Sequence, residues 1–433
     1  MTEQISIGLM GLGVVGTGVA TAIRERSHAL AQRIGAPVRI DRVLVRDGRS
    51  ERPGLSGDLS LTTDPDAILK NPNISLIIEV MGGEYPALHY ISAAIAAGKH
   101  VVTANKEVMA KHGPELLSAA AKNGVMLRFE GSVGGGIPII GPLLDDLAAN
   151  DISAVNAIIN GTTNYMLTKM ATEGLDYSTV LKEAQALGYA ESDPAADVDG
   201  VDAAFKLAIL ASLAFRTVVR DSDVFREGIT HLGPSDFRYA KELGYVIKLL
   251  AIARRTESRV LARVHPAFLP ISHPLAKVDG VYNAVEMEGD LVDWAMFQGP
   301  GAGARPTASA VLADVVAIGR AIVGDARVAP PPLLDETRAI ETLDDLKTKY
   351  YIRLRAADRS GVMAQVTRVL GDLSVGLASV IQNPVGETGK AAEIVITTHL
   401  ARERDVQQAL QELSALDFVD EIGNLIRIEG RIE

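Results

Sequence analysis

Three glycines near the start of the sequence constrain the fold more than any other feature. Gly11, Gly13 and Gly16 form the pattern G-x-G-x-x-G where an apolar run, ISIGLM, meets a single predicted helix, VVGTGVATAIRERSHALAQRI, which begins with Val14 and Val15. In a parallel α/β sheet such glycines permit a tight turn, a close backbone approach to a pyrophosphate and close packing of helix on strand. The helix N-terminus adds free N–H groups and a positive dipole end. The pattern predicts a Rossmann-type domain that binds a dinucleotide; the alternative is a glycine-rich turn without a ligand.

The length and the order of the predicted elements indicate several domains. A chain of 433 residues is too long for one ordinary hydrophobic core. Residues 1–150 alternate short β-like runs with helical patterns, which is typical of a parallel α/β sheet, and the helical segment 301–325 is expected to return to this domain. Residues 151–300 have the pattern of a mixed α+β domain. A linker with three consecutive prolines covers 326–348, and residues 349–433 follow the order βαββαβ of a ferredoxin-like sandwich.

Composition excludes several classes of function. Aromatic residues make up 4% of the chain and the formal net charge is −11, so we expect no nucleic-acid or anionic-membrane partner. The sequence contains no cysteine, which removes disulfides, thiolate metal sites and covalent thiol catalysis. The N-terminal residues lack the basic segment, apolar run and small-residue cleavage site of a signal peptide. We therefore expect a soluble cytoplasmic protein.

Polar residues follow several predicted strands of the first domain, where open α/β sheets bind ligands. The second strand ends VLVRD, and an arginine such as Arg46 can pair there with a 2′-phosphate, so we expect NADP, with NAD also possible. The alternative is that Arg46 and Asp47 form an ordinary surface pair. TANKEVMA places Asn105 and Lys106 just past another strand, and Lys106 is either a ligand contact or an ordinary exposed lysine. The segment FEGSVGGGIP, near Glu130, offers many backbone carbonyl groups. These would bind a monovalent cation or let a substrate approach.

Residues 188–210, GYAESDPAADVDGVDAAFKLAIL, combine a dense acidic loop with a lysine in an apolar helix. Asp202 and Lys206 are four residues apart, so they share one helix face. The apolar surroundings favour burial of Lys206, and a buried lysine requires a carboxylate partner. A desolvated lysine loses its proton more easily and can act as a general acid or base. Glu191 and Asp197 would bind a substrate ammonium; the alternative is a solvated acidic loop before a core helix.

Taken together, these motifs resemble those of the homoserine dehydrogenase family. The resemblance covers essentially the whole chain, in the order GLGVVG, TANK, EGSVGGGIP, NGTTNYM, GYAESDPAADVDGVDAAFK and GPGAGARPTASAV. NGTTNYM and the spacing of the acidic segment are the most specific of them. The C-terminal unit resembles an ACT regulatory domain, including the turn DRSGVMAQV into its first helix. The resemblance implies a reversible, NAD(P)-dependent reduction of L-aspartate 4-semialdehyde to L-homoserine, on the route to threonine, methionine and isoleucine.

The resemblance also implies roles for individual residues. Lys206 matches the lysine that donates a proton to the aldehyde oxygen, and Asp202 matches its neighbour in the pocket. Lys106 matches a lysine close to cofactor and substrate, and Glu191 a substrate-binding carboxylate. Gly303, in GPGAG, matches a glycine on the nicotinamide side. Family members can bind sodium, mainly through backbone oxygens, and the matching residues are Glu130, Val133, Gly135 and Ile137.

The expected partners are small molecules and further copies of this chain. The resemblance implies a homodimer through the middle domain or a homotetramer built on the ACT domains, with L-threonine as a feedback inhibitor. No aspartate-kinase segment precedes residue 1, so we expect a monofunctional enzyme. Two alternatives fit the sequence less well. Another NADP-dependent amino-acid dehydrogenase should lack NGTTNYM and the acidic segment, and a non-catalytic sensor should have lost at least one of Lys106, Glu191, Asp202 and Lys206, but this sequence retains all of these features.

Overall fold

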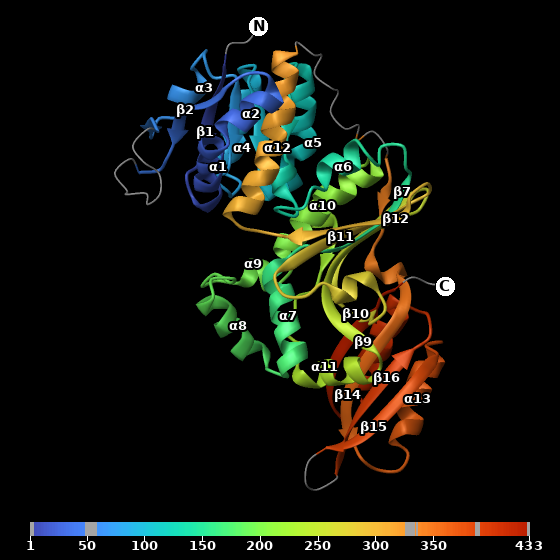
Figure 1. Ribbon diagram of the computed structural model, residues 1–433. Helices are drawn as coiled ribbons and strands as arrows, with labels where there is room; N and C mark the ends of the chain where they lie inside the picture. Colours follow the sequence, from blue (N-terminus) through green and yellow to red (C-terminus); the bar gives the residue numbers. More distant parts are fainter. Residues whose placement is uncertain (1–3, 48–58, 325–333, 335–336, 386–389, 431–433) are drawn as a thin grey trace.

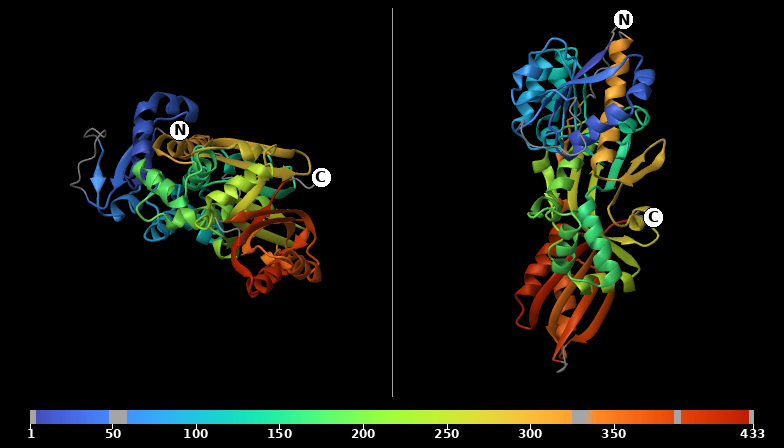
Figure 2. Two further views of the ribbon diagram at one scale, coloured as in Figure 1. Left: turned by 90° about the horizontal axis from the view of Figure 1, so that it is seen from below. Right: turned by 60° about the vertical axis from the view of Figure 1, so that its left-hand side comes forward.

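The computed structural model shows an elongated molecule in which the N-terminal and C-terminal units lie at opposite ends (Figures 1 and 2). The proline run at residues 330–332 lies outside the described part of the chain. The structure describes residues 4–47, 59–324, 334, 337–385 and 390–430.

The N-terminal unit is built on a parallel sheet. Its strands are β1 (Ile5–Met10), β2 (Val38–Leu44), β3 (Leu61–Thr62), β4 (Leu76–Glu79), β5 (His100–Thr103) and β6 (Leu127–Arg128). They follow the order β3-β2-β1-β4-β5-β6, and all pairs are parallel. This is the strand order of a Rossmann fold, which places the ligand-binding crevice at the carboxyl ends of β1 and β4. The predicted fold of this unit is confirmed.

Helices cover both faces of this sheet, as a buried parallel sheet requires. They are α1 (Val14–Glu25), α2 (Ser27–Ile34), α3 (Asp66–Leu69), α4 (Ala87–Ala96), α5 (Lys106–Lys122) and α12 (Ala304–Val323). The sequence pattern predicted one helix where α1 and α2 stand; the chain bends at Arg26, and both helices pack against α12. The close approach is visible at Gly18, where an added Cβ would lie 2.5 Å from the carbonyl oxygen of Ala304. The helix α12 thus joins the N-terminal unit although it follows the middle domain in sequence (Figure 1).

Among the described residues, α12 is also long and apolar enough to cross a membrane by length and composition. Half of its apolar window is buried inside the fold, where Val311, Val315 and Ile318 belong to the core between α12 and the parallel sheet. Core helices of globular domains pass the same test, so this helix is weak evidence for a membrane span.

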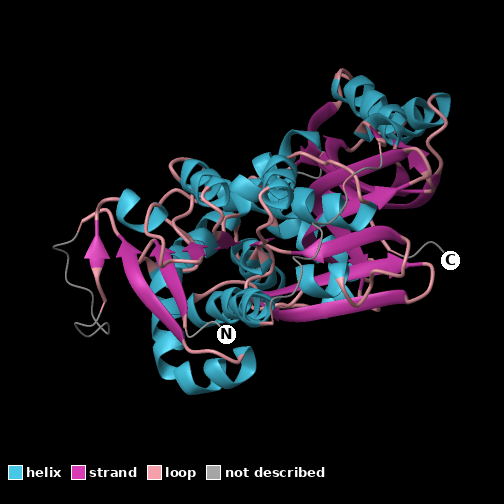
Figure 3. Cartoon of the chain, turned by 90° about the horizontal axis from the view of Figure 1, so that it is seen from above, coloured by secondary structure: helices cyan, strands magenta, loops and turns pink. Residues whose placement is uncertain are grey.

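The middle domain consists of a mostly antiparallel sheet and helices packed on it. Its strands are β7 (Ile152–Ile158), β8 (Val224–Arg226), β9 (Tyr245–Arg255), β10 (Arg259–Pro270), β11 (Tyr282–Gly289) and β12 (Asp293–Pro300). Its helices are α7 (Gly161–Glu173), α8 (Tyr177–Ala186), α9 (Ala195–Val198), α10 (Val201–Phe215) and α11 (Pro234–Glu242). The helix α6 (Ile140–Leu144) also contacts α10, although it lies within the residues 1–150 predicted for the first domain. Helices α7, α10 and α11 all contact β9, so these three helices pack on one sheet. Figure 3 shows the helices of the chain in cyan and its strands in magenta.

The C-terminal unit has the predicted βαββαβ order. Its main elements are β14 (Lys347–Ala357), α13 (Val362–Asp372), β15 (Leu377–Val385), β16 (Ala391–Thr398), α14 (Glu403–Ser414) and β18 (Val419–Ile428), with the short strand β17 (Ala401–Arg402) paired to β14. The short strand β13 (Ala339–Ile340), within the predicted linker 326–348, pairs in parallel with β10 of the middle domain. Residues of α13 and α14 form one core with β14 and β16. The α/β fold class is therefore confirmed in all three units.

A finding beyond the sequence prediction is that the last two units share one sheet. The strand β18 pairs in parallel with β10 through Ala267 and Phe268, which extends the middle sheet to twelve strands. A second connection is Asp236 of α11, which is fully buried and accepts hydrogen bonds from Arg353 Nε at 2.8 Å and from the Tyr351 hydroxyl at 3.2 Å. The C-terminal unit is thus joined to the middle domain by backbone pairing and buried polar contacts.

Candidate functional site

The glycine pattern forms an open turn at the N-terminus of α1. Gly11 has φ +101°, a left-handed conformation that favours glycine. A Cβ on Gly16 would lie 2.1 Å from the carbonyl oxygen of Gly11, whereas a Cβ on Gly13 would meet no atom within 4 Å. Val14 is 73% exposed, and no side chain caps the helix. The first and third glycines therefore serve the turn and its packing, and the second leaves space for an anionic ligand at the free N–H groups.

The space at Gly13 gives a prediction that separates binding from folding. Gly13→Ala is expected to leave the melting temperature unchanged but to weaken NADPH binding by about tenfold or more, because a charge-assisted contact is worth about 1.5–3 kcal/mol. Gly16→Ala should lower both the melting temperature and the affinity for NADPH, because its Cβ would collide with the backbone carbonyl of Gly11. Thermal unfolding without ligand and fluorescence titration with NADPH measure the two effects. Wild-type affinity in Gly13→Ala would contradict a pyrophosphate at this turn.

Lys106 is presented at the carboxyl edge of the parallel sheet. It is the first residue of α5, which Asn105 caps by accepting a hydrogen bond from the backbone N–H of Val108 at 3.1 Å. The Lys106 ammonium group donates to the Asp202 carboxylate, although the two residues are 96 positions apart. The parallel-sheet domain and the middle domain therefore meet at this ion pair.

Lys206 reaches the same carboxylate from the middle domain. Its Nζ lies 2.7 Å from Asp202 Oδ2, one helix turn earlier in α10, and 2.8 Å from the carbonyl oxygen of Ile159. The side chains of Lys206 and Asp202 are 12% and 5% exposed, whereas Lys106 is 43% exposed. The predicted pair on one helix face is thus present and largely buried, and a second lysine completes it.

Asn160 is a member of the site that the sequence analysis did not single out. It precedes α7, and its Oδ1 accepts a hydrogen bond from the backbone N–H of Thr163 at 2.8 Å, which caps the helix. Its Nδ2 donates to Asp197 at 2.6 Å and to Asp202 at 2.9 Å. An asparagine before a helical segment is a sequence signal for an N-cap, but the contacts with both carboxylates depend on how α7 and α10 pack.

The electrostatics of this cluster follow from burial and from the shared carboxylate. Burial lowers the pKa of Lys206 below its usual value, against the opposing charge of Asp202. Burial also acts to lower the pKa of Lys106, but the Asp202 carboxylate outweighs it and the pKa is raised. Burial opposes ionisation of Asp202, yet the two ammonium groups hold its pKa far below the usual range. Burial raises the pKa of Asp197. Lys206 is the group whose proton is more easily released.

Other predicted residues lie outside this cluster. Glu191 is exposed, and in the described part of the chain its carboxylate has no hydrogen bond or ion pair with the cluster; its backbone carbonyl accepts a hydrogen bond from Gln185 at 3.0 Å. Arg46 is exposed just after the end of β2. Gly303 precedes α12 with φ +121° and ψ 158°, a conformation that favours glycine. Arg46 thus lies at the carboxyl edge of the parallel sheet and Gly303 at the start of α12, whereas Glu191 lies in the loop between α8 and α9.

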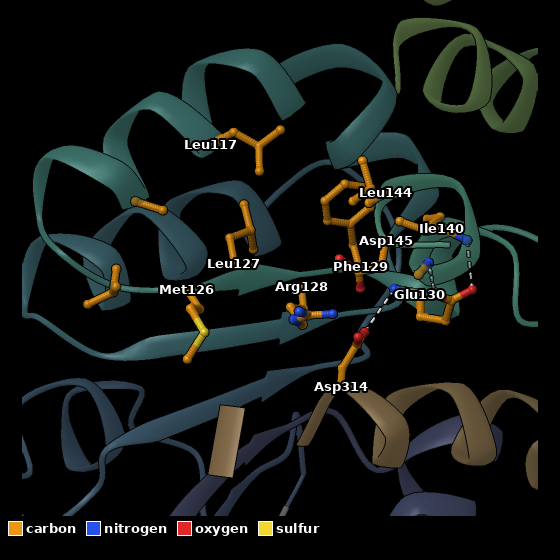
Figure 4. Close-up of a pocket in the computed structure, with 13 residues that line it drawn as sticks. Leu117, Met126, Leu127, Arg128, Phe129, Glu130, Ile140, Leu144, Asp145 and Asp314 are labelled. Atoms are coloured by element: carbon orange, nitrogen blue, oxygen red, sulfur yellow. Dashed lines mark hydrogen bonds between the residues drawn. The ribbon is translucent and has the colours of Figure 1, made fainter. Parts of the chain in front are cut away.

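The predicted cation loop follows β6 and packs on the connection to α12. The Glu130 carboxylate accepts the backbone N–H groups of Ile140 at 2.9 Å and Gly141 at 2.6 Å (Figure 4), and also that of Ile139 at 2.6 Å. Its oxygens are therefore engaged in the fold. Gly134 and Gly135 both have left-handed φ values, and Gly136 N–H donates to the Pro300 carbonyl at 3.0 Å.

The donor chemistry of this loop is compatible with a hard cation. Among the described residues, no group of three or more histidine, cysteine or acidic side chains could hold a metal ion. A cation at this loop would therefore rely on backbone carbonyl oxygens, such as those of Val133, Gly135 and Ile137, which are oxygen donors of the kind that sodium accepts.

A cavity of about 180 Å³ lies next to this loop, between α5, β6 and α6. Its walls are mainly aliphatic, and Asp314 borders it and accepts the Glu130 N–H at 2.8 Å (Figure 4). Burial raises the pKa of Asp314 to about 7. None of Lys106, Asp202 and Lys206 lines this cavity, so it is distinct from the lysine cluster.

Comparison with known proteins finds matches along nearly the whole chain. Residues 11–130 match the family model "Homoserine dehydrogenase, NAD binding domain", residues 138–316 match "Homoserine dehydrogenase", and residues 350–418 match "ACT domain". The homoserine dehydrogenase of Synechocystis sp. is 45% identical over 436 residues, which cover 98% of this chain and 99% of that protein. The homoserine dehydrogenase of Bacillus subtilis is 40% identical and covers 99% of both chains.

Solved structures agree with this assignment. A crystal structure of a homoserine dehydrogenase from Thiobacillus denitrificans matches with a TM-score of 0.93 and 43% identity, covering 98% of each chain. A hyperthermophilic archaeal homoserine dehydrogenase mutant in complex with NADPH matches with a TM-score of 0.63 and 25% identity, covering 75% of this chain and all of that one. Because the family models and relatives of 40–45% identity together cover nearly its full length, this chain belongs to the homoserine dehydrogenase family.

Proposed function

We propose that this chain catalyses the reversible reduction of L-aspartate 4-semialdehyde to L-homoserine with NADPH, on the route to threonine, methionine and isoleucine. The observation that carries the proposal is the meeting of two lysines on one buried carboxylate. Lys106 comes from the Rossmann domain and Lys206 from the middle domain, and both bind Asp202. A proton donor beside the carboxyl edge of a dinucleotide-binding sheet is what carbonyl reduction requires.

The proposed roles follow from charge and position. When bound, the nicotinamide cofactor supplies the hydride for the aldehyde carbon. Lys206 donates a proton from its ammonium group to the carbonyl oxygen, which becomes the hydroxyl of the product; in the reverse direction its neutral amine takes that proton back. Asp202 holds both lysines, and Lys106 contacts cofactor and substrate. Glu191 and Asp197 bind the ammonium group of the amino-acid substrate.

NADP is favoured over NAD by Arg46, an exposed cation after β2 that suits a 2′-phosphate. The archaeal relative in complex with NADPH is consistent with this choice. Sodium is proposed as a structural cation at the loop after β6. The cofactor contacts are proposed at Gly11, Gly13, Val14, Val15, Gly16, Arg46, Lys106 and Gly303, and the sodium ligands at Glu130, Val133, Gly135 and Ile137.

Regulation by L-threonine through the ACT domain is part of the proposal. Its physical support is the continuous sheet across β10 and β18 and the buried contacts of Asp236, because an effector that changes the ACT domain acts directly on the middle domain. A homodimer or homotetramer and a cytoplasmic location stay predictions from sequence.

A single assay series tests these points. Reduced nicotinamide is followed by its absorbance with homoserine and NADP⁺, then with NAD⁺, in sodium, potassium or choline buffers of equal ionic strength, with and without threonine. We expect turnover with a preference for NADP⁺. A folded chain that binds NADPH but turns over neither cofactor would instead favour the non-catalytic sensor. Threonine that alters neither rate nor melting temperature would remove the regulatory proposal.

A further inference from the structure

A carboxyl group without a cationic partner is buried at the end of β4. Glu79 is fully buried, and among the ion pairs of the described residues none includes it. Its neighbours in the parallel sheet are Met10 on one side and Thr103 on the other. Burying an ionisable group without a counterion is unfavourable, and burial raises the pKa of Glu79. The stability of the sheet would not require a carboxyl group here, because an apolar residue would fill the place at lower cost.

The carboxyl group connects the two loops that follow β4 and β5. One oxygen of Glu79 accepts the backbone N–H of Met81 at 2.8 Å, and the other accepts the Thr103 hydroxyl at 2.5 Å. The Thr103 oxygen in turn accepts the backbone N–H of Asn105 at 3.0 Å. Glu79 is therefore the start of a hydrogen-bonded chain that runs along the carboxyl edge of the sheet.

Asn105 completes this chain and ends it beside Lys106. Its Nδ2 donates to the Gly83 carbonyl at 2.7 Å, and its Oδ1 caps α5. Gly82 and Gly83 both have left-handed φ values, and a Cβ on either would meet no atom within 4 Å. The loop after β4 therefore borders open space, and two hydrogen bonds hold it: the one from Met81 to Glu79 and the one from Asn105 to Gly83. Lys106, the next residue, is the first of α5.

We propose that Glu79 is a positioning residue for Lys106, acting through Thr103 and Asn105. This inference rests on the proposed function, because it concerns the lysine that binds Asp202 from the Rossmann domain. Glu79 fixes the direction in which α5 begins and therefore where the Lys106 ammonium group meets Asp202. Catalytic groups that are misplaced by about 1 Å can lose on the order of a hundredfold in rate, so a rigid support below Lys106 has a direct effect on turnover.

The test combines Glu79→Gln with Lys106→Met in a double-mutant cycle. The glutamine keeps the size of the side chain and an acceptor for Met81, but its amide nitrogen cannot accept the Thr103 hydroxyl proton. We expect kcat to fall by about tenfold or more in Glu79→Gln, while the melting temperature stays the same or rises because no charge is buried. In the Lys106→Met background, Glu79→Gln should change kcat by less than about twofold, since residues acting through one another are not additive. Glu25→Gln, at an exposed position of the same domain, is the matched control.

Each outcome decides the role of Glu79. A wild-type kcat in Glu79→Gln would overturn it, and so would an equal loss in the wild-type and Lys106→Met backgrounds. A loss of activity that merely follows a lower melting temperature would make Glu79 a structural residue. An inactive wild-type chain would overturn the proposed function and this role together, whereas an active wild type with an unaffected Glu79→Gln would overturn this role alone.

Discussion

Lys206→Met is expected to lower kcat for homoserine oxidation by about 10²–10⁴-fold, the usual contribution of a positioned proton donor. Methionine keeps the helix propensity and most of the side-chain volume within the apolar helix α10. Asp202 keeps Lys106 as its partner, so the substitution does not leave a buried carboxylate unpaired. The variant should therefore fold and bind NADPH with nearly wild-type affinity. Steady-state kinetics, NADPH titration and thermal unfolding measure these three properties.

Two further variants sharpen this prediction. Lys206→Arg keeps a positive charge but holds its proton, because a guanidinium group stays protonated in proteins. If proton transfer matters, Lys206→Arg should be nearly as slow as Lys206→Met; wild-type activity in Lys206→Arg would mean that charge alone suffices. Lys182→Met, an exposed lysine on α8, is the control and should be fully active. Nearly unchanged turnover in Lys206→Met would mean that Lys106 or water, and not Lys206, donates the proton.

The direction of the pH dependence follows from the lowered pKa of Lys206. Aldehyde reduction needs its ammonium form, so the rate of reduction should fall as pH rises through this pKa. Homoserine oxidation needs the neutral amine, so its rate should rise over the same range. Both limbs should lie at lower pH than the value of 10.5 for an unperturbed lysine. Lys206→Met should abolish the pH dependence of both rates over this range.

Asp202→Asn is expected to lower the activity about as much as Lys206→Met does, and to lower the stability of the fold more than Lys206→Met does. The asparagine leaves Lys106 and Lys206 facing each other without a compensating charge, which further lowers the pKa of Lys206 and disturbs the placement of both lysines. We expect kcat/KM to fall by about a hundredfold or more. Removing one partner of a largely buried ion pair typically costs about 3–5 kcal/mol. Kinetics and thermal unfolding give the two values.

The stability change should depend on pH in a defined sense. In the folded protein the pKa of Asp202 lies below its unfolded value. The carboxylate therefore stabilises the fold at pH values above the pKa of an unfolded aspartate, and this contribution is lost as pH falls through the folded pKa. The difference in melting temperature between wild type and Asp202→Asn should accordingly shrink in acid. Asp199→Asn, at an exposed position of the same segment, should have the melting temperature of the wild type at every pH. If Asp202→Asn also kept the wild-type melting temperature, the ion-pair role of Asp202 would be contradicted.

Much of the fold could be predicted because it rests on short-range patterns. The alternation of strands and helices identified the Rossmann sheet and the βαββαβ unit, and an apolar helix around Lys206 was evident from ten or so residues. The break between α1 and α2 was missed, because both halves carry apolar residues at helical spacing and only their packing on α12 separates them. The pairing of β10 with β18 was also missed, because the sequence of a strand does not show which other strand it will pair with.

The candidate site divides in the same way. The sequence by itself determined the local geometry: the open turn at Gly13, and Asp202 and Lys206 on one helix face, because backbone conformation and helix periodicity act over a few residues. Only the tertiary structure decided that Lys106 joins them from 96 positions away, that Asn160 bridges two carboxylates, and that the Glu130 side chain is engaged in backbone hydrogen bonds. These contacts depend on how apolar faces of separate elements pack, and that packing brings together polar groups whose spacing along the chain carries no signal of their meeting.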